Sequence, residues 1–239
     1  GVVVVDPGPL APLHLRELEA QGRVELILLT HGHLDHSESA PRLSARTGAP
    51  VRARDPAHCL GAAPLRDGEE IVAGGCRIRI VVAPGHSDDS ACFELPDDRC
   101  AHRETAHGSM LTGDVILGRG STVIAWPGGS VAAHLKTLAR LRESTAAVVL
   151  PGHGPTGGDL ARMSGEALHH REHRGRAVVA ALEQVGRDPD PDDAELVSTV
   201  VSAVYPALKP ALRRAAGMSV AAHLAHLRAS CRNSPESGA

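Results

Sequence analysis

Four potential metal ligands occur within six residues near the start of the chain, directly after the apolar run 24–29. They are His31, His33, Asp35 and His36. Imidazole nitrogens and carboxylate oxygens are ligands that a borderline metal ion such as zinc accepts in proteins. Side chains alternate along an extended chain, so we expect the first two histidines on one side of a loop and the later pair in the next element. Fifteen histidines in 239 residues will sometimes cluster, but this spacing favours a metal site.

Three further candidate ligands lie in separate loops, each after a short apolar run. His86 and His153 each follow a Pro-Gly pair, and Asp114 follows the run 110–113. Either histidine alone would be better interpreted as a surface or structural residue. The pattern of strand, turn and ligand nevertheless occurs at four places, and loops at the ends of rigid strands bring distant residues to one ion. Together with the first cluster, these residues predict a metal site assembled from several loops.

The N-terminal part of the chain predicts alternating strands and helices. Apolar runs predict strands at 2–5, 24–29 and 49–53, and the spacing of leucines predicts a helix at 13–20. A second helix is expected at 37–46, ended by Thr47 and Gly48. This order indicates a layered α/β architecture with ligands on loops at strand ends. The residues alone leave open whether the sheet is doubly wound or part of a sandwich.

The middle of the chain predicts a hairpin, a strand and then a polar insertion. Apolar runs within 69–83 flank a Gly-Gly pair, and a strand is expected at 91–95. The insertion at 96–109 carries His102 and His107. We interpret these two histidines as exposed loop residues rather than as ligands.

The C-terminal third is predicted to be helical. A helix at 131–142 and a strand at 146–150 lead into a long helix at 159–185, which an acidic, proline-bearing linker ends. Small helical units can bind DNA through a recognition helix. When attached to an enzyme they more often cover its site or form a homodimer contact. Three short helices are expected, the last with Ser219 as its N-cap, at 192–205, 211–216 and 219–229.

Composition limits the classes of protein that the chain can represent. The formal charge of −3 gives no overall attraction to phosphate, and three aromatic residues provide few stacking platforms for single-stranded nucleic acid. Five cysteines without C-x-x-C spacing argue against a disulfide framework or a thiolate zinc site. The chain has no signal-like segment and no apolar run of about eighteen residues, which predicts a cytoplasmic protein without a membrane partner.

The seven candidate ligands resemble the signature of the metallo-β-lactamase fold superfamily, which is H-x-H-x-D-H followed by His, Asp and His in later loops. The resemblance implies an αββα sandwich. It is closest to the glyoxalase II-like branch, which implies a catalytic domain at 1–187 and a small helical, winged-helix-like domain at 188–239. Family members begin with further strands, so we expect N-terminal strands to be missing from this chain. The segments that resemble this branch are 118–123, 151–155, 169–174 and 221–227.

The resemblance also implies a division of the ligands between two zinc ions. It implies that His31, His33 and His86 bind one ion. It implies that Asp35, His36 and His153 bind the other, and that Asp114 bridges the two. Two such ions lower the pKa of a bridging water, which predicts hydrolysis of a thioester or ester by a metal-bridged hydroxide. Asp35 is the predicted catalytic residue, because it would orient this hydroxide and pass its proton to the leaving group. Iron or manganese could take the place of zinc.

Four further residues are expected around these ligands. Asp6 and Thr30 are the nearest candidates to fix the orientation of the metal-binding imidazoles, although an aspartate before Pro-Gly serves equally well to begin a turn. Ser121 and Thr122 are the candidates for substrate binding in the pocket wall.

Two other functions stay open on the sequence. The same branch includes a single-strand endoribonuclease, and the basic residues of 169–176 could form part of a channel for RNA. Alternatively, zinc could stabilise a module that binds nucleic acid through its last helices, but structural zinc sites are usually closed and need only four ligands. Net acidity and few aromatic residues favour the hydrolase, with a small thioester or ester substrate, free or attached to a carrier.

Overall fold

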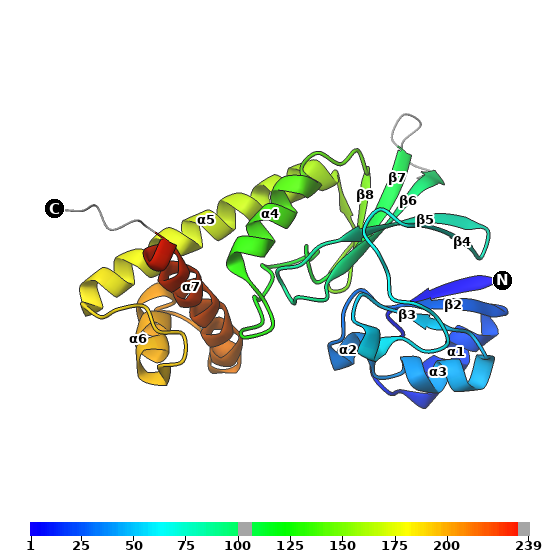
Figure 1. Ribbon diagram of the computed structural model, residues 1–239, viewed down its shortest axis with the longest axis horizontal. Helices are drawn as coiled ribbons and strands as arrows, with labels where there is room; N and C mark the ends of the chain where they lie inside the picture. Colours follow the sequence, from blue (N-terminus) through cyan, green and yellow to red (C-terminus); the bar gives the residue numbers. More distant parts are fainter. Residues whose placement is uncertain (100–106, 234–239) are drawn as a thin grey trace.

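The computed structural model describes residues 1–99 and 107–233, and its N-terminal two thirds form four layers (Figure 1). Helices α1 (Pro12–Ala20) and α3 (Ala40–Thr47) cover one sheet, and helices α4 (Val131–Leu141) and α5 (Leu160–Val185) cover the other. The two sheets share an apolar core between them. This arrangement confirms the predicted αββα sandwich of the α/β class.

The smaller sheet consists of three parallel strands, in the order β1 (Val2–Val5), β2 (Val24–Leu28) and β3 (Val51–Arg52). Branched apolar residues favour a pleated strand, and a parallel sheet needs cover on both of its faces. Leu15 and Leu43 provide this cover on the outer face, where they are completely buried with Ile27 of β2.

The larger sheet has six strands, in chain order from β4 to β9. Their bounds are β4 (Glu70–Ala73), β5 (Cys76–Val82), β6 (Ala91–Arg99), β7 (His107–Gly113), β8 (Val148–Pro151) and β9 (Gly157–Gly158). Ile80 and Phe93 lie on its inner face and are completely buried with Leu28 of the smaller sheet.

Three strands of the larger sheet run in the same direction. Strands β5 and β7 are both antiparallel to β6, and β8 is parallel to β7. The carboxyl ends of β5, β7 and β8 consequently lie at one edge of the sheet, and the loops after them start there. This edge carries the candidate metal centre.

The helix predicted at 37–46 is wrong in its extent, because this region contains two helices. Helix α2 (Leu34–Ser37) comes first, and α3 begins at Ala40. Pro41 lies in the first turn of α3, where the N–H that proline lacks would have no partner within the helix. In the interior of a helix that began before Ala40, the same proline would remove a hydrogen bond. The break places Asp35 and His36 on a short helix of their own.

The polar insertion predicted at 96–109 is shorter than expected, because β6 continues to Arg99 and β7 begins at His107. Pairing of the two strands satisfies backbone groups that a polar loop would leave to water. His102 and the side chain of His107 lie outside the described residues, so their exposed loop role stays a prediction.

Two helices predicted in the C-terminal region form one continuous helix, α7 (Arg213–Asn233), which follows α6 (Ala194–Val204). Gly217 lies inside α7 and does not end it. Ser219 is therefore not an N-cap, and its hydroxyl accepts a hydrogen bond from the N–H of Ile124. Val220 and Leu224 are buried against α5 and α6, and this burial outweighs the cost of about 1 kcal/mol that one glycine brings to a helix.

The described part of the C-terminal region is helical, as predicted. Among residues 188–233 the structure contains no strand, so it does not show a winged helix. Helices α6 and α7 share a core with the second half of α5, and the boundary at residue 187 stays a prediction. Within the described part of the chain, every helix is either too short or too polar to cross a membrane.

Candidate metal centre

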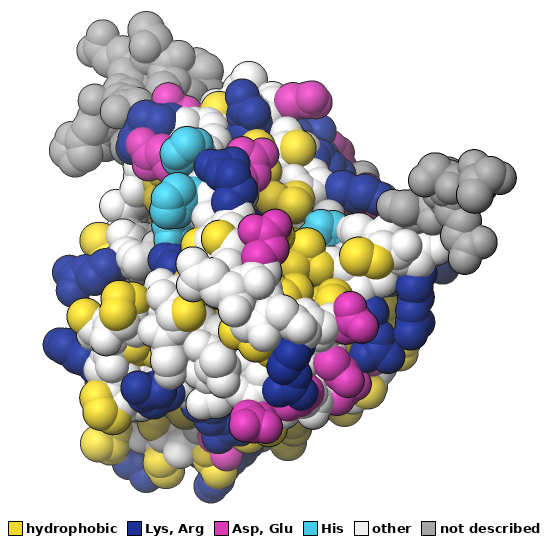
Figure 2. Space-filling model, turned by 90° about the vertical axis from the view of Figure 1, so that its left-hand side faces the viewer, with side chains coloured by type: hydrophobic (Ala, Val, Ile, Leu, Met, Phe, Trp, Pro, Cys, Tyr) yellow, Lys and Arg dark blue, Asp and Glu magenta, His cyan; other side chains and the backbone are white. Residues whose placement is uncertain are grey.

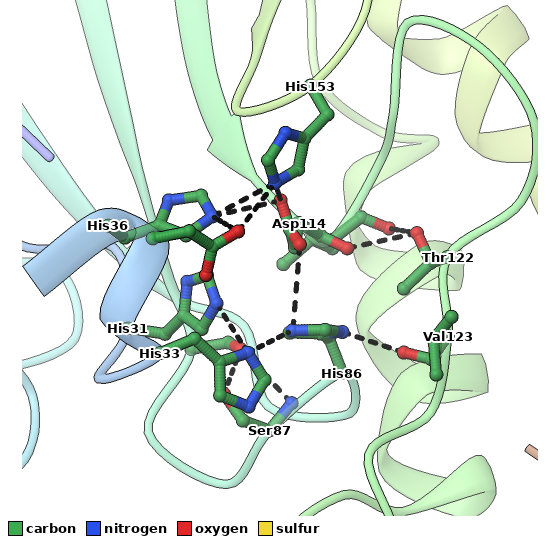
Figure 3. Close-up of polar contacts among 12 residues, drawn as sticks. His31, His33, His36, His86, Ser87, Asp114, Thr122, Val123 and His153 are labelled. Atoms are coloured by element: carbon green, nitrogen blue, oxygen red, sulfur yellow. Dashed lines mark hydrogen bonds and ion pairs between the residues drawn. The ribbon is translucent and has the colours of Figure 1, made fainter. Parts of the chain in front are cut away.

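The seven predicted ligands converge at the edge of the sandwich where β5, β7 and β8 end (Figure 3). Four loops bring them there, since the loop and short helix after β2 lie opposite the ends of these three strands. The loops after β2, β5, β7 and β8 supply, in this order, His31, His33, Asp35 and His36; His86; Asp114; and His153.

Three histidines form the first group. The Nδ1 atom of His33 lies 2.9 Å from Nε2 of His31 and 3.0 Å from Nε2 of His86. One ligand atom from each residue lies within 4.8 Å of the other two. Three imidazoles that meet in this way match the ligand number of a catalytic zinc site, which keeps a further position open.

A second group consists of Asp35, His36 and His153. The Nε2 atom of His153 lies 3.2 Å from Oδ2 of Asp35 and 3.3 Å from Nε2 of His36. Asp114 lies between the two groups, with Oδ1 3.5 Å from Nε2 of His36 and Oδ2 3.7 Å from Nε2 of His86. A carboxylate with its two oxygens directed to different groups is suited to bridge two ions.

The site is buried on one side and open on the other. His31, His36 and His86 are at most 5% exposed, whereas the side chains of Asp35 and His153 are 56% and 51% exposed. Burial, followed by repulsion from neighbouring imidazoles, lowers the pKa of His31 to about 2, and burial also lowers the pKa of His86. Both are thus neutral at physiological pH, which is the form that binds a metal ion.

Asp6 holds the side chain of His36 and the backbone and side chain of Thr30 in place. Its Oδ2 lies 2.8 Å from Nδ1 of His36, and its two carboxylate oxygens accept hydrogen bonds from the N–H and the hydroxyl of Thr30 at 2.7 Å and 2.6 Å. Burial opposes protonation of His36, but the hydrogen bond and charge of Asp6 raise the pKa of His36 overall. The structure therefore places Asp6 and Thr30 behind the imidazoles, as expected.

Three supporting groups were not predicted. Asp89 accepts a hydrogen bond at 2.7 Å from the N–H of Gly32, between the first two histidines, and the carbonyl of Val123 lies 2.7 Å from Nδ1 of His86. The third is Gly152, where a Cβ would lie 2.9 Å from Oδ1 of Asp114 and closer still to the ring of His36. The glycine before His153 was a sequence signal for this close approach, because glycine has no side chain. No sequence pattern indicates the contact between the Val123 carbonyl and His86.

The residues fit a metal centre of two ions. Oδ1 of Asp114 is buried and has no hydrogen-bond partner among the residues that the structure describes, which is costly for a carboxylate unless a cation compensates it. Ring nitrogens of different histidines also face each other at about hydrogen-bond distance, and imidazole nitrogens that converge on one point are ligands that a metal ion accepts. The His and Asp clusters are thus consistent with a dinuclear metal site.

The two predicted substrate-binding residues differ in their surroundings. Thr122 is buried, and its hydroxyl donates hydrogen bonds to the carbonyls of Asp114 and Val115 at 2.9 Å and 3.1 Å. Ser121 is exposed and lines a cavity beside this loop. Thr122 consequently stabilises the backbone around Asp114, and contact with a substrate stays a prediction for both residues.

Residues 1–153 match the sequence model of the metallo-beta-lactamase superfamily. The chain therefore belongs to this superfamily.

Curated relatives extend this assignment. The chain is 32% identical over 173 residues to Lactamase-like protein adaB from Aspergillus niger, which covers 71% of this chain and 50% of the relative. It is 28% identical over 169 residues to Atrochrysone carboxyl ACP thioesterase AgnL7 from Paecilomyces divaricatus, covering 70% and 49% of the two chains. The chain thus spans about half the length of the curated relatives it matches.

Solved structures share the fold. A metallo-beta-lactamase family protein from Thermus thermophilus, TTHA1429, superposes with a TM-score of 0.69 at 24% identity, over 92% of this chain and 79% of that one. The protein TTHA1623 in a di-iron-bound form superposes with a TM-score of 0.53 at 26% identity, over 67% and 84% of the two chains. The first similarity includes the C-terminal helices, since it extends over almost the whole chain.

Proposed function

We propose that the protein is a dinuclear zinc-dependent hydrolase that cleaves a thioester, with an ester as the alternative substrate. The observation that supports this most directly is the pair of three-residue groups joined by Asp114, whose buried Oδ1 has no hydrogen-bond partner among the described residues. Two bound ions would supply Lewis acids that lower the pKa of water and stabilise a departing thiolate or alkoxide. Iron is an alternative metal, supported by the di-iron form of TTHA1623.

The ligands of one ion would be His31, His33 and His86, with Asp35, His36 and His153 for the other. In this proposal Asp35 also passes a proton to the leaving group. Its carboxylate is suited to this because it is half exposed and lies 3.2 Å from Nε2 of His153 at the open side of the site. The partly buried carboxylate of Asp6 would keep His36 in one orientation throughout.

The substrate class that we favour is an acyl thioester attached to a carrier. Among the curated relatives is an acyl carrier protein (ACP) thioesterase, which supports a carrier-bound substrate for this chain as well. The exposure of Asp35 and His153 leaves one side of the site open to a substrate held by a large partner. Ser121 would contact the substrate from the neighbouring loop.

The arrangement of the helices gives less support to a nuclease. A channel for RNA would need the arginines of 169–176 on the surface, but Arg171 is only 4% exposed. The guanidinium of Arg174 lies 4.2 Å from the ring centroid of Tyr205 and is thus engaged within the protein. We therefore rank single-strand RNA below a thioester as substrate.

Metal content tests the first part of the proposal. Protein purified without chelator is expected to contain about two zinc or iron ions per chain by plasma mass spectrometry. Less than one ion per chain after supply of zinc and iron during growth would contradict a dinuclear centre.

Replacement of Asp35 tests the reaction. Asp35→Ala removes a ligand and the proposed proton carrier, so we expect thioester hydrolysis to fall by about 10²–10⁴-fold. The measurement compares short acyl-pantetheine thioesters with labelled single-stranded RNA. Asp88→Ala is the matched control, because this exposed carboxylate lies near His86 outside both groups. Cleavage of RNA alone, abolished by Asp35→Ala, would replace the thioesterase with the nuclease.

A further inference from the structure

A cavity of about 250 Å³ lies between the loop after Asp114 and the helices α4 and α5. None of the seven predicted ligands lines it, although Ser121 and Thr122, on the loop beside the metal centre, do. Its walls are mainly apolar, and the polar lining includes a buried arginine and a buried histidine. The residues that matter here are Ile116, Leu117, His134, Met163, Ala167 and Arg171.

Arg171 is a buried cation without an acidic partner among the described residues. Its side chain is 4% exposed, Nη2 donates a hydrogen bond at 2.5 Å to the carbonyl of Thr122, and Nε is buried without a partner. Burial lowers the pKa of Arg171 to about 10, which leaves it charged at physiological pH. A buried charge without a counterion is strongly unfavourable, so this guanidinium needs an anion that the described residues do not provide.

His134 adds a second unsatisfied group at the same place. It is 1% exposed on α4, and its buried Nδ1 has no hydrogen-bond partner within residues 1–99 and 107–233. Burial, and then the charge of Arg171, lower the pKa of His134 to about 3. A neutral imidazole beside the guanidinium can donate one hydrogen bond to an anion without adding a second charge.

The surrounding charges restrict the ligand further. Glu166 lies at the rim, where its carboxylate is paired with Arg162 at 2.6 Å, and His170 is the other titratable residue in the lining. The cavity therefore has one uncompensated positive charge in an apolar surrounding. A single carboxylate matches this charge and the fork of a guanidinium, whereas a dianionic phosphate would bring excess charge into apolar walls.

We propose that this cavity binds a small monocarboxylate with a short apolar body, held by Arg171 and His134. The carboxylate would contact these two side chains, and its apolar part would lie against Ile116, Leu117 and Met163. The same guanidinium holds the carbonyl of Thr122, so the ligand would lie one hydrogen bond from the loop of the bridging aspartate. The proposal does not depend on hydrolytic activity.

Calorimetric titration of the metal-loaded protein with sodium butyrate tests the proposal. Arg171→Met removes the charge, and Ala167→Leu fills the cavity while the charge stays. Each change is expected to weaken butyrate binding at least tenfold, and uncharged butyramide and inorganic phosphate are expected to bind at least tenfold more weakly than butyrate. Arg176→Met is the matched control, because this arginine lies on the same helix but is exposed.

Metal content is measured for every variant, because butyrate bound at the metal centre would be retained in both variants. Equal butyrate affinity in the wild type and in Ala167→Leu would overturn the proposal, and this comparison decides it even if Arg171→Met does not fold. Phosphate or butyramide binding as tightly as butyrate would equally exclude a carboxylate site.

Discussion

At the scale of single residues, one carboxylate organises the buried side of the metal centre. Asp6 has a left-handed backbone (φ 47°), which aspartate and asparagine adopt more readily than most other residues with a side chain. This conformation follows the end of β1 and lets the side chain contact both Thr30 and His36. The sequence pattern Asp-Pro-Gly suggested a turn, and the structure gives the same aspartate a second role as an anchor.

Asp6→Asn is expected to weaken metal binding without unfolding the protein. Asparagine keeps the size and tolerates the left-handed backbone, but it loses the charge that orients His36. We expect a 10- to 100-fold lower affinity for one of the two ions, a magnitude typical of such partners of metal ligands. Competitive titration with a chromophoric chelator measures it, and Asp88→Asn is the control. Unchanged affinity for both ions would mean that Asp6 only forms the turn.

At the scale of elements, the C-terminal helices pack tightly enough to override a local breaking signal. Gly217 lies within α7, where a Cβ would meet no atom closer than the Cγ1 of Val197 at 3.8 Å. The position therefore has room for a side chain, and its helical backbone gives glycine no conformational advantage. Glycine here costs stability only through the freedom that it gives to the unfolded chain.

Gly217→Ala should raise the free energy of unfolding by about 0.5–1 kcal/mol, measured by urea denaturation. The contrasting control is Gly186→Ala at the end of α5, where φ is 65° and a Cβ also meets no neighbour. That change should destabilise the protein by roughly 1 kcal/mol because of backbone strain. If Gly217→Ala is as destabilising as Gly186→Ala, α7 is not continuous at this position.

At the scale of the whole molecule, the helices α5, α6 and α7 form an apolar core of their own and also bury the basic residues Arg171 and His223. Figure 2 shows the face of the molecule that these helices form. His223 of α7 is 3% exposed, and in the described part of the chain its Nε2 has no hydrogen-bond partner. Burial, followed by the charges of Arg171, His226 and Arg174, lowers the pKa of His223 to about 3. The C-terminal helices thus bury a histidine in its neutral form.

This burial predicts that stability decreases as the pH falls below about 6.5. The unfolded chain protonates His223 near its ordinary pKa of 6.5, whereas the folded chain keeps it neutral down to about pH 3. The unfolded state therefore binds one proton more between these values, and lower pH favours it. His223→Gln should reduce the slope of unfolding free energy against pH by up to about 1.4 kcal/mol per unit between pH 6 and 4.

Urea denaturation at several pH values, on protein with equal metal content, measures this slope. His14→Gln is the control, because this histidine is 45% exposed on α1. A wild-type slope in His223→Gln would show that His223 is not held neutral in the folded protein.

The short-range patterns of the sequence carried most of the information about the elements and the ligands. The strand at 2–5 and the hairpin around Gly74 were predicted correctly, because apolar runs and glycine turns act locally. The seven candidate ligands could be named for the same reason, since each follows an apolar run within a few residues. The division of residues 34–47 into two helices was missed, because the position of Pro41 decided it. The extension of β6 was missed, because its pairing with β7 decided it.

What only the tertiary structure decided is the set of contacts between segments that lie far apart in the chain. The Val123 carbonyl next to His86, the Asp89 contact with Gly32 and the Arg171 contact with Thr122 join different loops and helices. Neither a backbone carbonyl nor a buried arginine leaves a pattern in the sequence, because its partner is set by packing. By itself the sequence determined which side chains could bind metal, and the packing of two sheets determined that they meet.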